Sequence, residues 1–219
     1  DLLQVPYSCC NVLAAALTFN KFSCNQYLKG FGVRISESVM LRKGQTITDE
    51  AAVEKIGLPC FIKPNLGGSS FGVTKVKAKE QIQPAIKKAF DEAQEVIIEA
   101  FMEGTEITCG CYKTKSKEHV FPITEVVTSN EFFDYDAKYN GQVEEITPAR
   151  ISEDLTKRVQ TLTSAIYAIL GCQGIIRIDY IITKGDKINL LEINTTPGMT
   201  ATSFIPQQVK AAGLDMKDV

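Results

Sequence analysis

Three oxygen-bearing side chains near the C-terminal end of the sequence, those of Asp179, Glu192 and Asn194, could together bind a metal ion. Residues 174–182 alternate between apolar and polar positions with the period of a β-strand, and residues 187–193 predict a second strand after a short turn. Carboxylate and amide oxygens are hard ligands of the kind that Mg²⁺ and Mn²⁺ prefer. The pattern therefore predicts a divalent-metal site on one face of a hairpin.

The turn between the two strands decides whether these side chains meet. Gly185-Asp186 suits a two-residue hairpin loop, which would place Asp179 directly opposite Glu192. The same loop would place Arg177 opposite Asn194. Opposed carboxylates lie only about 5 Å apart at Cβ and repel each other, and a bound cation would remove that repulsion. The alternative is a solvated hairpin face with scattered charge, and a one-residue bulge would break the expected pairing.

The segment from Lys63 to Gly72 predicts a phosphate-binding loop. Its glycines free the backbone to approach a ligand closely, and consecutive N–H groups can surround phosphate oxygens. Ser69 and Ser70 add hydroxyl donors, and Lys63, at the end of an apolar strand, could add a positive charge. The lysine precedes the glycines, so this is not a Walker A motif. A flexible hairpin tip is the alternative interpretation.

The composition excludes several classes of protein. A chain of 219 residues with 44% hydrophobic and 23% charged residues is typical of one or two globular domains. Its net charge of −2 gives no electrostatic reason to expect nucleic acid or a membrane surface as a partner. No apolar run approaches the roughly 20 residues needed to span a bilayer, and no segment has the pattern of a signal peptide.

The seven cysteines and the single histidine give little indication of a metal site or a catalytic triad. The cysteines have no C-x-x-C spacing, which argues against a disulfide framework or a zinc site. Cys109 and Cys111 are expected to be small buried hydrophobic residues. Without a second histidine beside His119, a histidine-centred triad has little support. We expect a reducing, cytoplasmic compartment.

The elements that must position these residues mix helices and strands without internal repeats. Helices are expected over residues 11–28 and 49–56, around an apolar stripe at 82–90, and from the N-cap Ser152 to the terminating Gly171. Strands are expected over residues 60–63, 73–76, 95–99, 105–112, 119–127, 174–182 and 187–193. The long polar stretch 128–148 is expected to be a functional loop. Because the strands occur in runs with a helix between them, the α+β class fits best.

Taken together, these segments resemble the D-alanine–D-alanine ligases of the ATP-grasp superfamily. The matching segments occur in the family's order and cover nearly the whole chain, and the last of them is highly specific. They are Lys63-Pro64 with Gly68-Ser69-Ser70-Phe71-Gly72, Ile98-Glu99 with Glu106, Asp134-Tyr135-Asp136-Ala137-Lys138-Tyr139, Gly171-Cys172, Arg177-Ile178-Asp179, and Leu191-Glu192-Ile193-Asn194-Thr195-Thr196-Pro197-Gly198-Met199-Thr200. The chain departs from the family at Gly67, where an acidic residue is frequent, and at Ala100, where lysine is frequent.

The resemblance implies an ATP-grasp fold in which two α+β lobes clamp a nucleotide between them. The central lobe would comprise residues 11–99 and the C-terminal lobe residues 100–219. Family members begin with a further α/β domain, so residues 1–10 are expected to be a remnant of a missing N-terminal domain. A fragment of this kind is expected to bind ATP or ADP and to be inactive alone, because the first D-alanine would lack its pocket.

The resemblance also assigns nucleotide and metal ligands. Adenine would contact the connection that contains Glu99, Phe101 and Met102, and Glu106 would reach the ribose. The phosphates would contact Lys21 and Lys63, with Ser69 and Ser70 closing over them, and the loop around Lys138 and Tyr139 would close the site. Asp179, Glu192 and Asn194 would hold two Mg²⁺ or Mn²⁺ ions. Lys21 and Glu106 are otherwise surface charges.

The reaction that the resemblance implies is the ATP-dependent joining of two D-alanine molecules through an acyl phosphate, for peptidoglycan synthesis in the bacterial cytoplasm. Arg177 and the Gly198 N–H would stabilise the oxyanion, with Ser69 and Tyr139 as further catalytic residues. The alternative for Arg177 is a structural ion pair with Asp179. Ser203 and the Phe204 main chain would hold the carboxylate of the second substrate.

Three other functions remain open at this point. They are a D-alanine–D-serine ligase, a D-alanine–D-lactate ligase and a nucleotide-binding module without catalysis. Tyr139 resembles the tyrosine of dipeptide-forming members, which favours an amine as the second substrate. The family also implies a homodimer for the full-length enzyme.

Overall fold

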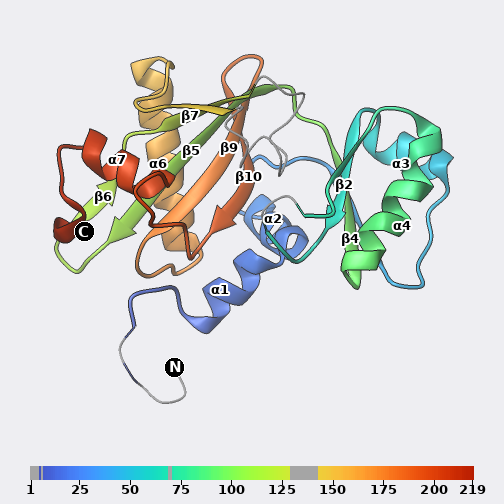
Figure 1. Ribbon diagram of the computed structural model, residues 1–219, viewed down its shortest axis with the longest axis horizontal. Helices are drawn as coiled ribbons and strands as arrows, with labels where there is room; N and C mark the ends of the chain where they lie inside the picture. Colours follow the sequence, from blue (N-terminus) through green and yellow to red (C-terminus); the bar gives the residue numbers. More distant parts are fainter. Residues whose placement is uncertain (1–4, 6, 69–70, 129–142) are drawn as a thin grey trace.

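The computed structural model describes residues 5, 7–68, 71–128 and 143–219, which form two antiparallel sheets with helices packed on them (Figure 1). The α-helices are α1 (Val12–Phe19), α2 (Lys21–Lys29), α3 (Asp49–Ile56), α4 (Ile82–Glu92), α6 (Glu153–Ile169) and α7 (Phe204–Ala211), with 3₁₀ turns at Lys79–Gln81 and Met216–Asp218. The strands are β1 (Ser38–Arg42), β2 (Cys60–Pro64), β3 (Thr74–Val76), β4 (Glu95–Ala100), β5 (Gly104–Lys113), β6 (Glu118–Val120), β7 (Thr124–Thr128), β8 (Val143–Ile146), β9 (Ile176–Thr183) and β10 (Lys187–Asn194). The expected α+β class is confirmed.

The smaller sheet has the strand order β1-β4-β2-β3, and helices α3 and α4 cover one of its faces (Figure 1). Helix α3 begins at the N-cap Thr48, whose side chain accepts a hydrogen bond from the Ala51 N–H, and ends at Gly57 with φ of 82°. Pro84 lies in the first turn of α4, where a missing N–H removes no helical hydrogen bond. Both helices therefore lie where the sequence predicts them.

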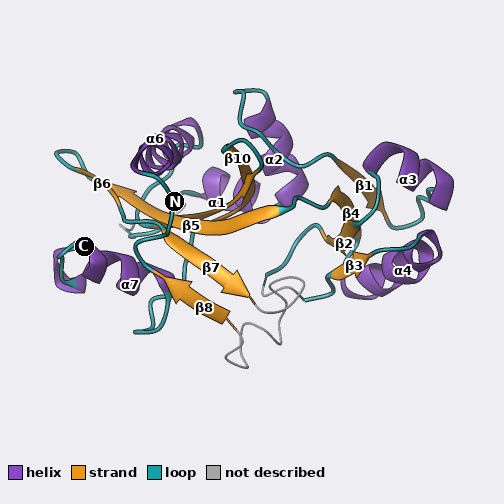
Figure 2. Cartoon of the chain, turned by 90° about the horizontal axis from the view of Figure 1, so that it is seen from above, coloured by secondary structure: helices purple, strands orange, loops and turns teal. Residues whose placement is uncertain are grey.

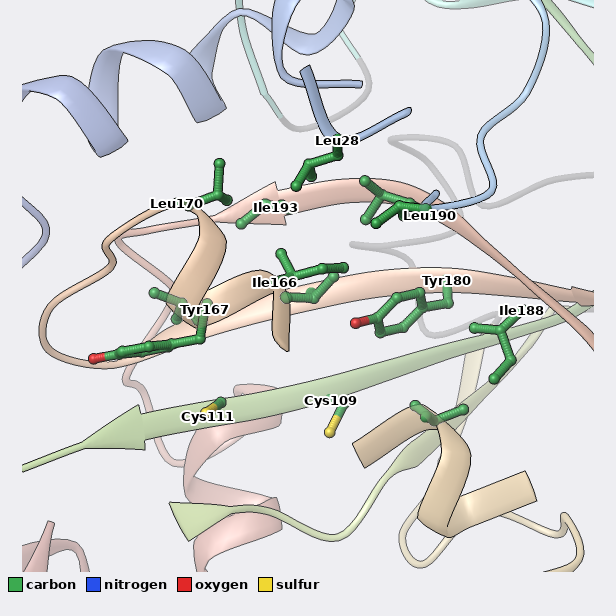
Figure 3. Packing of buried hydrophobic residues seen from close by; sticks show 14 of the residues in the cluster. Leu28, Cys109, Cys111, Ile166, Tyr167, Leu170, Tyr180, Ile188, Leu190 and Ile193 are labelled. Atoms are coloured by element: carbon green, nitrogen blue, oxygen red, sulfur yellow. The ribbon is translucent and has the colours of Figure 1, made fainter. Parts of the chain in front are cut away.

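The larger sheet has the order β10-β9-β5-β7-β8, with β6 paired to β5. Helices α6, α1 and α2 lie over one face and α7 over the other (Figure 2). The first face carries the main hydrophobic core, in which Ile166 of α6 and Leu28 of α2 pack on the sheet (Figure 3). The opposite face is only partly covered by α7, which leaves room for a site beside the smaller sheet.

Strand β9 shows the alternation that the sequence predicts. Ile176, Ile178 and Tyr180 point into the main core, and Arg177 and Asp179 point to the other face. The Tyr180 hydroxyl is fully buried and lies 2.8 Å from the Thr163 hydroxyl of α6, so its polar end has a partner (Figure 3). One face of β9 thus packs in the main core, and the other carries the predicted site residues.

Three expected elements differ from the prediction. The helix over 11–28 is two helices, because Asn20 leaves the helical conformation and caps α2 by accepting a hydrogen bond from the Ser23 N–H. The strand over 119–127 is interrupted between β6 and β7, where Pro122 has no N–H to donate to a ladder. Within the segment expected to be a loop, residues 143–146 form β8, which pairs with β7.

No helix among the residues described is long and apolar enough to cross a bilayer. All seven cysteines are free thiols, and Cys109 and Cys111 are fully buried, as expected.

Candidate active site

A cavity of about 480 Å³ lies between the two sheets. The smaller sheet lines it with Lys63 and Glu99, and the larger sheet lines it with Glu106, Asp179 and Glu192. Lys21, at the start of α2, also lines it. The structure therefore brings together predicted site residues from four separate segments of the chain, which are Lys21, Lys63, Glu99 with Glu106, and Asp179 with Glu192.

The β9–β10 hairpin pairs Asp179 with Glu192 and Arg177 with Asn194, as expected, but its turn and its ladder differ from the prediction. The turn contains three residues, from Lys184 to Asp186, because Thr183 pairs with Lys187. A bulge at Leu191 then shifts the register by one residue. The longer turn and the bulge cancel, so the predicted two-residue loop is wrong while the predicted pairing is confirmed.

The bulge also decides which face the metal-ligand candidates occupy. Leu190 lies in the core, and Leu191 and Glu192 both line the cavity. After the bulge Ile193 returns to the core. In a regular strand a side chain two residues after Leu190 would again face the core, so the extra residue turns Glu192 toward the cavity.

The carboxylate of Asp179 is buried and surrounded by donors. Arg177 donates to it twice, from Nε to Oδ1 at 2.9 Å and from a terminal nitrogen to Oδ2 at 2.7 Å. Thr108 Oγ1 donates to Oδ1 at 2.5 Å, and Asn194 Nδ2 donates to Oδ2 at 3.1 Å. Thr108 is not among the site residues predicted from the sequence, although it lies two residues after Glu106 and so shares its face of β5.

The donor set suits a hard divalent cation. Asn194 Nδ2 lies 3.1 Å from an oxygen of Asp179 and 3.3 Å from an oxygen of Glu192, so both carboxylates converge on one point. Amide nitrogen and oxygen are assigned from the hydrogen-bond network, and a rotated amide would present its oxygen there instead. No three His, Cys, Asp or Glu side chains cluster within the described ranges, so the set consists of two carboxylates and one amide. Such oxygen donors fit Mg²⁺ or Mn²⁺.

Arg177 is held rigidly between the acidic side chains and α7. Its side chain is 14% exposed, and its guanidinium lies 5.1 Å from the centre of the Phe204 ring. Burial opposes its charge, but Asp179 and then Glu192 outweigh burial and raise the pKa of Arg177 above its ordinary value. The expected ion pair with Asp179 exists, and it holds a permanent positive charge at the cavity wall.

Lys63 and Glu99 form a buried ion pair across β2 and β4. Phe61 lies directly opposite Glu99, so Lys63, two residues further on, projects from the same face. Lys63 Nζ lies 2.5 Å from Glu99 Oε2, and the two side chains are only 12% and 5% exposed. The pair therefore places a lysine and a carboxylate side by side at the cavity wall.

Lys21 reaches the cavity from α2. Its Nζ donates to the Gly67 carbonyl at 2.5 Å, within the loop expected to bind phosphate. Burial lowers the pKa of Lys21, the carboxylate of Glu192 raises it, and the neighbouring charge of Lys63 lowers it further. The two lysines face one cavity, and such a pair suits an anion with more than one negative charge.

The connection between β4 and β5 forms the apolar end of the cavity. Ala100, Phe101 and Met102 line it, and the Phe61 and Phe101 rings are 5.9 Å apart. A flat heterocycle would contact aromatic and main-chain groups here. Glu99 and Glu106 lie at either end of this connection.

Of the remaining predicted site residues, only Phe204 lines the cavity among those that the structure describes. Gly198 and Ser203 do not line it. Those two are adjacent, since a Cβ at Gly198 would come within 2.8 Å of Ser203 Oγ. Ser69, Ser70, Lys138 and Tyr139 lie outside the described residues.

Glu106 should make the stability of the protein pH-dependent. Burial, with the charges of Asp179 and Glu192, raises the pKa of Glu106 from 4.5 to about 8, and Arg177 opposes the shift. Between these values the folded state holds a proton that the unfolded state releases, so stability falls as the pH rises. We expect the free energy of unfolding of wild type, relative to Glu106→Gln, to fall by up to about 1.4 kcal/mol per pH unit in this window. Urea denaturation at pH 5.5, 6.5 and 7.5 measures it, and parallel profiles would contradict the assignment.

The chain is similar to known ligases over its whole length. A family model described as "D-ala D-ala ligase C-terminus" matches residues 27–219. The D-alanine--D-alanine ligases of Bacteroides fragilis and Phocaeicola vulgatus are 81% and 77% identical, and each match covers all of this chain and 68% of the relative.

Solved structures agree with the sequence comparison. The VanG D-Ala:D-Ser ligase from Enterococcus faecalis superposes with a TM-score of 0.84 at 34% identity, covering 98% of this chain and 63% of that one. A D-alanine--D-alanine ligase from Bacillus anthracis complexed with ATP superposes with a TM-score of 0.82 at 28% identity, covering 98% and 67%. This chain thus spans about two thirds of the length of these proteins.

Proposed function

The chain belongs to the family of D-alanine–D-alanine ligases, which are ATP-dependent enzymes, and from this premise we propose that its cavity binds ATP to activate the carboxylate of D-alanine. The observation that carries the proposal is the convergence of Lys21, Lys63 and the Asp179–Glu192 pair on one cavity between two sheets. Phosphoryl transfer demands positioning and neutralisation of charge, and both are built into this arrangement.

The nucleotide would lie along the cavity from its apolar to its charged end. Adenine would contact the main chain from Glu99 to Met102, and the Glu106 carboxyl would accept or donate hydrogen bonds at the ribose. The phosphates would contact Lys21 and Lys63. From the family pattern, Ser69, Ser70 and Lys138 would complete this end.

Asp179, Glu192 and Asn194 would hold Mg²⁺ or Mn²⁺. Two such ions would neutralise the charge that develops on the transferring phosphoryl group. Thr108 and Arg177 fix Asp179 in place, so the carboxylate needs little rearrangement to act as a ligand. The Asn194 amide would have to rotate to present its oxygen.

The second step is the attack of an amine on the acyl phosphate. The rigid guanidinium of Arg177 and the Gly198 N–H would donate to the developing oxyanion. Ser203 and the Phe204 main chain would hold the carboxylate of the second D-alanine, next to Arg177. Tyr139, from the family pattern, would close the site.

The organisation of the whole protein is a further part of the proposal. We place the division between the lobes at residues 99 and 100, although α1 and α2 pack on the larger sheet. Cytoplasmic location, a role in cell-wall precursor synthesis and a homodimer follow from the family.

The experiment that tests the proposal measures ATP binding by calorimetry, with and without Mg²⁺, and then phosphate release with D-alanine, D-serine or D-lactate. The Bacteroides fragilis ligase serves as the positive control. We expect Mg²⁺-dependent ATP binding by the 219 residues and a preference for D-alanine in any turnover. Preference for D-serine or D-lactate would favour the relatives of those specificities, and absence of ATP binding would contradict the proposal.

A further inference from the structure

Asn65 is a buried polar residue between Pro64 and Leu66, which both line the cavity, and Asn65 itself does not line it. It follows β2 and precedes the glycines of the phosphate loop, and its side chain is 0% exposed. Burying an amide is unfavourable unless its hydrogen bonds are made, so its partners indicate why asparagine stands here.

Two contacts join Asn65 to the first turn of α2. The Asn65 carbonyl accepts from the Lys21 N–H at 3.3 Å, and the side-chain Oδ1 accepts from the Phe22 N–H at 2.9 Å. The first N–H groups of a helix have no partner within the helix. Asn65 therefore caps α2 from a distant segment, beside the local cap Asn20.

Two further contacts join Asn65 to β4 of the smaller sheet. Its Nδ2 donates to Glu95 Oε2 at 2.7 Å, and its N–H donates to the Glu95 carbonyl at 2.9 Å. Arg42 donates to the other oxygen of the Glu95 carboxylate at 3.1 Å. The Asn65 side chain is thus fixed at its acceptor end by α2 and at its donor end by the sheet.

These contacts matter because α2 packs on the larger sheet. Cys24 and Leu28 of α2 share a core with Leu190 and Ile193. Asn65 therefore connects β4 of the smaller sheet to helix α2, which packs on the larger sheet. It holds the start of α2 at the loop, where Lys21 Nζ contacts the Gly67 carbonyl at 2.5 Å.

We propose that Asn65 is a positioning residue that sets Lys21 against the loop at residues 65–68 and thereby orders the phosphate end of the nucleotide site. The inference rests on the proposed ATP binding. Lys21 carries the charge and Asn65 fixes where that charge stands, so loss of Asn65 should weaken contacts to phosphate and leave the adenine end unchanged.

The test compares ATP with adenosine, which lacks phosphates, by calorimetry on the 219-residue chain. For Asn65→Ala we expect at least a tenfold loss of ATP affinity, with adenosine affinity within about twofold of wild type. A purely structural role would lower both affinities or neither, and an unchanged ATP-to-adenosine ratio would overturn the inference.

Two controls separate this role from loss of stability. Thr163→Val removes a buried hydrogen bond to Tyr180 on the far face of the sheet, and it should lower the melting temperature without changing the ratio. In a Lys21→Ala background, Asn65→Ala should cause little further loss of ATP affinity, whereas additive losses would overturn the coupling.

A second variant keeps the test decisive if Asn65→Ala does not fold. Asn65→Asp preserves the acceptor for Phe22 but sets a carboxylate against Glu95, and it should change the ratio in the same direction. If the wild-type chain does not bind ATP, the proposed function fails and the inference fails with it. If the wild-type chain binds ATP and both Asn65 variants keep its ATP-to-adenosine ratio, the inference alone fails.

Discussion

Glu192→Gln is expected to abolish the Mg²⁺ dependence of nucleotide binding and turnover while the fold is retained. The substitution removes the charge of one proposed ligand without changing its shape. Metal ions contribute several kcal/mol to such reactions, so we expect about a 100-fold or greater loss of Mg²⁺-dependent turnover in an active form of the enzyme. In the 219-residue chain the same variant should bind ATP equally with and without Mg²⁺, as measured by calorimetry.

The matched control for Glu192→Gln lies in the same hairpin. Asp186 is exposed at the turn and has a φ of 52°, a conformation that asparagine tolerates. Asp186→Asn removes one carboxylate from the hairpin at a distance from the cavity, and it should behave as wild type. Retention of the full Mg²⁺ effect by Glu192→Gln would exclude Glu192 as a metal ligand.

Arg177→Met should lower the free energy of unfolding by about 3 kcal/mol, because it leaves Asp179 buried without its partner. The pair is bidentate, and the Asp179 side chain is only 9% exposed. For a chain of this size such a loss lowers the melting temperature by roughly 6–12 °C. Calorimetric or spectroscopic melting measures it.

The control for Arg177→Met is an arginine at the surface. Arg158 is 47% exposed, lies 3.7 Å from Asp154 one helical turn away and donates a hydrogen bond to the Asp186 carbonyl at 2.8 Å. Exposed contacts of this kind stabilise by about 1 kcal/mol or less. Arg158→Met should therefore lower the melting temperature by about 4 °C at most. A similar small change for Arg177→Met would mean that Asp179 is satisfied by Thr108 and Asn194 alone.

Local patterns predicted the two faces of β9 because alternation in a strand is a property of adjacent residues. The pairing of Asp179 with Glu192 was predicted correctly from a wrong turn. Leu190 and Ile193, on either side of the bulge, share a core with residues of α1 and α2, and no local pattern encodes such contacts between distant segments.

Contacts between distant segments could not be predicted from spacing. Thr108 contacts Asp179 from a neighbouring strand, across 71 positions of sequence. Asn65 joins α2 to β4, so its role becomes visible only when its own loop, α2 and β4 are seen together. The family resemblance supplied Lys21 and Glu106, which no local feature distinguishes from surface charges.

The irregular β9–β10 hairpin offers two places at which the length of this gene segment can change during evolution. They are the three-residue turn and the extra residue at Leu191, which the bulge absorbs. Deleting Leu191 would leave a regular ladder with Glu192 still opposite Asp179, and deleting one turn residue would leave Thr183 opposite Lys187 across a two-residue turn. We expect that relatives lose or gain single residues at these two places independently, because neither change moves Glu192 to the other face of the sheet.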